Sequence, residues 1–154
     1  MVIPISYVTS CFVNMLLSFI VVFAVIIVTG TGFNFLALLT LPVIMIVEYI
    51  FALGMSLLTS AVTVYFRDLE HILSIVAMAW MYMTPIVYTV PPQYEKYFRL
   101  NPMTHIIECY RTVLYNKQVP DLSTLLLAAG LGVFFLIIGA LVFNRLQRHF
   151  AEEL

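Results

Sequence analysis

Long apolar stretches and short polar interruptions alternate along the chain. Four stretches, at about 5–28, 35–64, 70–88 and 122–143, are made up mostly of apolar residues. Each has about the 20 residues or more that an α-helix needs to cross the hydrocarbon core of a bilayer. The pattern therefore predicts an all-α membrane protein, with four transmembrane helices in a single transmembrane domain over residues 1–154.

Small and polar residues inside these spans indicate where helices meet. Asn14 and Ser18 are four residues apart in the first span and share a face, so we expect them to point at a neighbouring helix. Small side chains recur every four residues in the second span, at Ala52, Ser56 and Ser60. Such a strip lets another helix approach closely. Ala128 and Gly132 form a similar pair in the fourth span.

The polar interval between the third and fourth spans has an amphipathic pattern. Asn101 is a suitable N-cap, and Pro102 suits the first position of a helix. The residues that then share the apolar face are Met103, Ile106, Ile107, Tyr110, Val113 and Leu114. Those that fall mostly opposite are Thr104, His105, Glu108, Arg111 and Thr112. The pattern predicts amphipathic helices over about 92–117 that lie on the membrane or re-enter it, and a tail from 144 to 154 that leaves it.

Composition agrees with a lipid environment. Hydrophobic residues make up 63% of the chain and charged residues 10%, and the mean hydropathy is +1.06. A chain of 154 residues has too little interior to hide so much apolar surface from water. The formal net charge of −1, with seven scattered Lys and Arg, argues against a nucleic-acid partner, which requires a concentrated basic face.

Catalysis finds little support in the sequence. The three histidines, His71, His105 and His149, are far from one another in sequence, and the two cysteines have no partner at metal-ligand spacing. A metal site is therefore not expected. The phosphate-binding pattern G-x-x-x-x-G-K-[ST] does not occur, so we expect this chain to bind no ATP through a P-loop. Energy for any transport must come from a partner or an ion gradient.

Glu48 is the one acidic residue in the middle of a predicted span. An ionisable group there is costly unless it faces water or a polar partner. One interpretation makes Glu48 a residue of a transport passage. The other makes it a structural carboxyl that is hydrogen-bonded to Asn14, Ser18 or a tyrosine of another helix.

Aromatic residues gather near the ends of the spans. Most of them fit the belts of aromatic side chains at membrane–water interfaces. A second interpretation is that Trp80, Tyr82 and Tyr88 line a passage in which sugar rings slide over aromatic faces.

Five short segments resemble, in the same order, the permease subunits of type-2 ABC exporters for polysaccharide, O-antigen or teichoic acid. The segments are VYFRD at 64–68, TPIVY at 84–88, LNP at 100–102, ECYR at 108–111 and FNRL at 143–146. Members of that family have six spans after an interfacial helix. The chain resembles the C-terminal part of such a permease, beginning just before its third span, and is expected to be a fragment of a longer protein.

The resemblance implies a homodimer of permease subunits in the bacterial cytoplasmic membrane, with both ends of this chain in the cytoplasm. Each copy docks on a cytoplasmic ABC ATPase subunit that holds ATP and Mg, and lipid-linked glycan passes outward between the copies. The count of Lys and Arg leans slightly the other way, towards a cytoplasmic 92–117 interval. The ordered motifs outweigh that count.

The resemblance also implies roles for particular residues. The turn that couples the permease to the ATPase consists of Phe66, Arg67, Asp68, Glu70 and His71. The candidates for the passage or its gate are Glu48, Trp80, Tyr82, Pro85, Tyr88, Asn101, Pro102, Glu108 and Arg111. Glu108 and Arg111, three residues apart, are expected to pair on the helix surface.

Three other functions fit the sequence less well. An ABC permease for drugs or lipids has the same architecture, and a closed helix bundle without a passage indicates a membrane scaffold instead. A membrane enzyme acting on lipid-linked sugars ranks last, because clustered acids, histidines and nucleophiles are missing from the sequence.

The coupling role of the 66–71 turn leads to a test. Asp68→Ala in the assembled transporter should lower both glycan-stimulated ATP turnover and export severalfold, because the ATPase then loses a polar contact with the permease. Normal turnover together with normal export in this variant would contradict the assignment.

Overall fold

The computed structural model describes residues 2–29, 34–65, 69–86, 88, 90–91 and 93–147. All regular elements in these segments are helices, as predicted. Three of the helices are long and apolar enough to cross a membrane: α1 (Val2–Thr29), α2 (Phe35–Tyr65) and α6 (Leu122–Gln147). The shorter helices are α3 (Leu69–Met83), α4 (Glu95–Phe98) and α5 (Pro102–Leu114).

The third apolar helix is shorter than predicted. It was expected to reach Tyr88, but α3 ends at Met83. Thr84 precedes Pro85, and the ring of a proline disfavours the helical conformation in the residue before it. The 15 residues of α3 span about 22 Å, which is less than the hydrocarbon core of about 30 Å.

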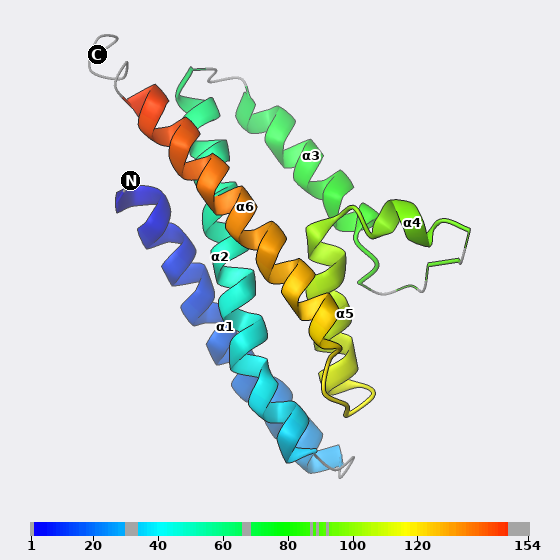
Figure 1. The fold of residues 1–154 in the computed structure, drawn as a ribbon. Helices are drawn as coiled ribbons and strands as arrows, with labels where there is room; N and C mark the ends of the chain where they lie inside the picture. Colours follow the sequence, from blue (N-terminus) through cyan, green and yellow to red (C-terminus); the bar gives the residue numbers. More distant parts are fainter. Residues whose placement is uncertain are drawn as a thin grey trace.

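Helices α3 and α5 together cover the length of α2. Helix α5 runs antiparallel to α2, because Tyr110 bonds to Glu48 and, further along the chain, Lys117 bonds to Asn34. Figure 1 shows α3 and α5 following one another along the bundle, with α4 projecting to the side. Their 15 and 13 residues give 28 in total, or about 42 Å, against about 46 Å for the 31 residues of α2. The two short helices together are thus about as long as α2.

Helices α2 and α6 run parallel and approach each other most closely at two glycines. A Cβ atom added to Gly54 would lie 2.5 Å from the backbone nitrogen of Leu136, and one added to Gly139 would overlap the Gly54 carbonyl oxygen. Earlier along both helices, Gly132 lies against Val47 and Phe51. The predicted contact role of Ala128 and Gly132 is therefore confirmed, and Ala128 is buried.

The prediction for the second span was wrong about which face receives a helix. Ser56 and Ser60 were expected to meet a close neighbour, but α6 approaches on the Gly54 side of α2. Leu57 and Ala61, which are buried against Phe143, continue that contact. The two serines instead line an open groove.

Helix α5 is inserted into the bundle. Its Ile106, Cys109 and Val113 belong to the main core. The other buried members of that core are Ala37, Leu41, Ile44, Val47, Phe51 and Ala128. The prediction that Thr104 and His105 occupy a polar outer face was wrong, because both side chains are buried.

Aromatic side chains contribute to the packing of α1 against the other helices. Phe12 contacts Tyr49 of α2, and Phe19 contacts Tyr110 of α5. The expectation that Asn14 and Ser18 point at a neighbouring helix was wrong. Both are exposed, and the Ser18 hydroxyl donates to the Asn14 carbonyl oxygen within α1.

The close contact of α2 and α6 predicts opposite effects of the same substitution at two glycines of α6. Gly139→Ala should destabilise the protein by about 1–3 kcal/mol, because the new methyl group overlaps the Gly54 carbonyl. Gly130→Ala, with nothing within 4 Å of the added Cβ, should be neutral or stabilising by up to about 1 kcal/mol. Thermal unfolding of both variants in detergent measures the difference, and equal Tm values would contradict the packing described.

Candidate functional site

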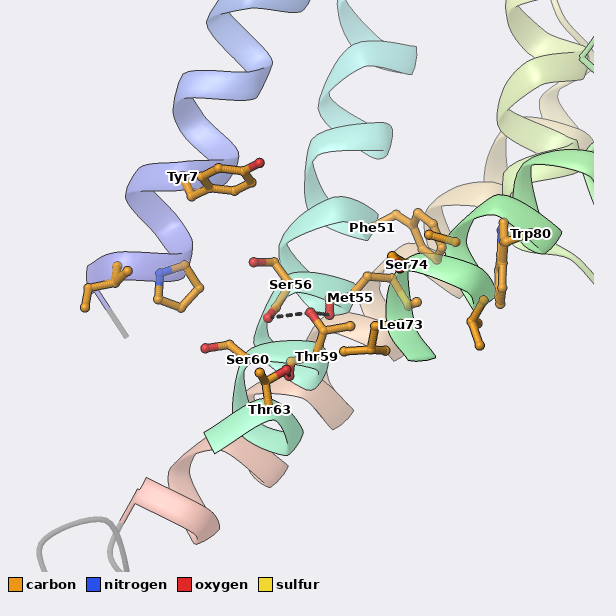
Figure 2. Close-up of a pocket in the computed structure, with 14 residues that line it drawn as sticks. Tyr7, Phe51, Met55, Ser56, Thr59, Ser60, Thr63, Leu73, Ser74 and Trp80 are labelled. Atoms are coloured by element: carbon orange, nitrogen blue, oxygen red, sulfur yellow. Dashed lines mark hydrogen bonds between the residues drawn. The ribbon is translucent and has the colours of Figure 1, made fainter. Parts of the chain in front are cut away.

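An open groove of about 1020 Å³ lies between α1, α2 and α3. Figure 2 shows its α2 wall, which carries the hydroxyl side chains of Ser56, Thr59, Ser60 and Thr63 over two turns. Ser74 of α3 adds a fifth hydroxyl. A helix surface of this kind is unusual in a chain so rich in apolar residues, and it gives the groove a mildly polar wall.

Three aromatic rings accompany these hydroxyls. Tyr7 comes from α1, Phe51 from α2 and Trp80 from α3, so each wall of the groove contributes one ring (Figure 2). Trp80 was predicted to line a passage, and it is the member of that predicted aromatic set that borders the groove. Flat apolar faces beside hydroxyl groups suit a ligand that is itself partly apolar and rich in hydroxyls.

Several groove hydroxyls donate their protons within their own helix. Thr63 donates to the Thr59 carbonyl oxygen at 2.8 Å, and Thr59 donates to the Met55 carbonyl oxygen at 3.0 Å. Ser74 donates to the His71 carbonyl oxygen at 2.7 Å. A hydroxyl oxygen used in this way keeps lone pairs that accept further hydrogen bonds. The groove wall therefore presents several weak hydrogen-bond acceptors, one at each of these hydroxyl groups.

The end of α3 is closed by side chains of the TPIVY segment. The buried Thr84 hydroxyl donates to the Trp80 carbonyl oxygen at 2.8 Å, and the Tyr88 hydroxyl donates to the Tyr82 carbonyl oxygen at 2.7 Å. The last turn of a helix leaves carbonyl groups without partners inside the helix. Tyr82 and Tyr88, which were predicted to line a passage, are absent from the groove lining, and the Tyr88 hydroxyl caps this turn.

Arg111 satisfies the next two carbonyl groups of the interrupted segment. Its Nη2 atom donates to the Pro85 carbonyl oxygen at 2.9 Å and to the Ile86 carbonyl oxygen at 3.1 Å. The predicted pairing of Arg111 with Glu108 was wrong. The one ion pair among the described residues joins Glu95 and Arg99.

Asn101 connects the end of α3 to the start of α5. Its side-chain oxygen accepts from the Met103 backbone N–H at 3.0 Å, so Asn101 is the N-cap of α5 and Pro102 its first residue, as predicted. Its side-chain nitrogen donates to the Thr84 hydroxyl oxygen at 3.0 Å. The start of α5 is thereby tied to the residue that caps α3.

Glu48 lies on the face of α2 that meets α5. The Tyr110 hydroxyl donates to its Oε2 atom at 2.6 Å. Of the partners expected from the sequence, a tyrosine of another helix is the one found. Glu48 is absent from the groove lining, so the described contacts favour its structural interpretation.

The predicted coupling turn falls largely outside the described residues. Phe66, Arg67 and Asp68 lie outside them, as does the side chain of Glu70. His71 is described and is exposed in the first turn of α3. Thr59 and Thr63 line the groove but were not singled out from the sequence. Their signal was the four-residue spacing of their hydroxyls, next to the Ala52, Ser56 and Ser60 spacing that was interpreted as helix packing.

Comparisons with known proteins give a consistent result. The sequence profile of the family described as "ABC-2 type transporter" matches residues 1–115. The chain is 31% identical to the O-antigen export system permease protein RfbA of Klebsiella pneumoniae, over 99% of this chain and 60% of that protein. It is 29% identical to the protein of the same name from Myxococcus xanthus, over 73% of this chain and 45% of that protein.

The chain spans about half the length of the curated relatives that it matches. No solved structure is significantly similar to it.

The contacts of Arg111 predict a large effect for its removal. Arg111→Leu should cost about 1–3 kcal/mol, because it leaves the carbonyl group of the buried Pro85 without this partner, so its Tm in detergent should fall by several degrees. Arg99→Leu is the matched control, because it breaks only the exposed Glu95 pair, which contributes a few tenths of a kcal/mol. Equal melting of the two variants would show that Arg111 does not hold the segment.

Proposed function

The chain belongs to the ABC-2 type transporter family, and on that premise we propose that it is part of the permease subunit of an ATP-driven exporter. The cargo is a lipid-linked polysaccharide of the O-antigen type, which moves outward across the bacterial cytoplasmic membrane. The relatives named for O-antigen export favour that glycan over teichoic acid. The chain is a transport component, and ATP hydrolysis takes place on a separate subunit.

The observation that carries the proposal is the groove between α1, α2 and α3. Its ladder of hydroxyls and its three aromatic rings provide many weak contacts in place of one deep pocket. A long polymer must slide during export, so each single contact with it must be weak. Hydroxyl oxygens exchange hydrogen bonds with successive sugars, and aromatic faces pack against the apolar faces of sugar rings.

The remaining parts of the proposal concern partners and orientation. Two permease copies form the passage, and a cytoplasmic ABC ATPase docks at the 66–71 turn. Helix α2 ends and α3 begins at the end of the bundle where α1 begins and α6 ends (Figure 1). Both ends of the chain are then cytoplasmic, and the division between α3 and α5 lies on the way to the outer side. A scaffold role is disfavoured, because a closed bundle would not leave a groove of about 1020 Å³.

The proposal is tested with the longest natural form of the protein, purified from native membranes in mild detergent. An ABC ATPase should co-purify in stoichiometric amount, and lipid-linked glycan should stimulate its ATP turnover. Absence of an ATPase under conditions that preserve known complexes would refute the exporter.

A variant pair then tests the groove. Ser60→Phe fills the groove and should largely abolish glycan export while leaving basal ATP turnover intact. Ser18→Phe, which makes the same change at an exposed position on α1 outside the groove, should export normally. Equal export by both variants would show that the groove is not part of the passage.

A further inference from the structure

A second, smaller hollow lies where α4, α5 and the end of α3 meet. Its volume is about 180 Å³. Six of its lining residues carry the argument: Glu95, Phe98, Arg99, Thr104, Glu108 and Arg111. It shares no residue with the groove between α1, α2 and α3. Since liquid water takes about 30 Å³ per molecule, the hollow has room for about six waters or for one small ring.

Thr104 gives the hollow an unmet hydrogen-bonding group. Its side chain is 8% exposed, and its hydroxyl oxygen is buried without a hydrogen-bond partner among the described residues. Buried hydroxyls in folded proteins nearly always have partners, and an exception calls for an explanation. A polar ligand in the hollow that Thr104 lines supplies the missing partner.

The charges around the hollow indicate a ligand without net charge. Two carboxylates and two guanidinium groups line it, so neither an anion nor a cation finds a surface of one opposite sign. Arg99 is paired with Glu95, and Arg111 already donates to two carbonyl oxygens. Glu108 lies outside these pairs and offers a strong acceptor to a hydroxyl donor.

Phe98 adds the last feature. Its ring lines the hollow and is fixed by a perpendicular contact with the ring of Tyr88, with the centroids 6.2 Å apart. A neutral molecule that presents hydroxyls on its edges and an apolar face to an aromatic ring is a pyranose sugar. We propose that this hollow binds a single neutral pyranose ring, with Thr104 and Glu108 as its hydrogen-bonding partners. The inference rests on the proposed export of glycan for the source of that ring, a unit of the passing chain.

The test is saturation-transfer NMR on the purified full-length protein in detergent. The probes are D-glucose, D-galactose, D-mannose and N-acetyl-D-glucosamine, together with the trisaccharide maltotriose as a chain of linked units. At least one monosaccharide and the trisaccharide should receive saturation. Thr104→Val and Glu108→Gln should each reduce the transfer by about threefold or more, the effect expected from losing one hydrogen bond.

Controls separate binding from folding. Thr112→Val makes the same change as Thr104→Val at a position on α5 outside the hollow and should retain full transfer. Glu108 is exposed, so Glu108→Gln should fold normally. This variant therefore tests the site even if Thr104→Val fails to fold. Transfer to none of the probes, or transfer unchanged in both hollow variants, overturns the site. Binding of monosaccharides alone overturns the assignment to a unit of a glycan chain.

The outcome is distinguishable from that of the export assay. A protein that exports glycan without binding these probes retains the proposed function and loses the subsite. A protein that binds them in the hollow but has no ATPase partner retains the subsite and loses the proposed function.

Discussion

Arg111 and the hydroxyls around it meet the main physical demand on this fold, which is that backbone polar groups away from water need partners within the protein. A continuous helix meets that demand by itself, but α3 ends at Met83 and α5 begins at Pro102, and the described residues between them form only the single helical turn of α4. The side chains of Thr84, Tyr88 and Arg111 donate hydrogen bonds to backbone carbonyl oxygens at and after the end of α3. The acceptors are the carbonyl oxygens of Trp80, Tyr82 and Pro85, respectively. The bonds from Arg111 also tie the segment that follows α3 to α5.

Helix α2 organises the rest of the molecule through three distinct faces. The glycine face receives α6 at Gly54, where two backbones come into contact. The carboxyl face receives α5 through the bond from Tyr110 to Glu48. The hydroxyl face, around Ser60, is left open as the groove. Small residues serve two of these faces for opposite reasons, because glycine allows contact between backbones whereas serine lines a space.

The two opposite roles of small residues explain which parts of the fold could be predicted from the sequence. The long helices, the N-cap at Asn101 and the packing of Ala128 follow from local pattern, and they were predicted correctly. Which small residues of α2 meet another helix depends on the direction from which α6 arrives, and no local pattern contains that direction. The burial of Thr104 was likewise missed, because the helical period separates polar from apolar faces without specifying what each face meets.

The two candidate functional regions are linked through a short chain of contacts. Trp80 borders the groove, its carbonyl oxygen accepts from Thr84, and the Thr84 hydroxyl oxygen accepts from Asn101 at the start of α5. Trp80, Thr84 and Asn101 thereby connect the wall of the groove to the start of α5. If the 66–71 segment receives the motion of the ATPase, as proposed, α3 receives it directly, since α3 begins at Leu69 within that segment. The hydrogen bond between Thr84 and Asn101 then couples that motion of α3 to the start of α5.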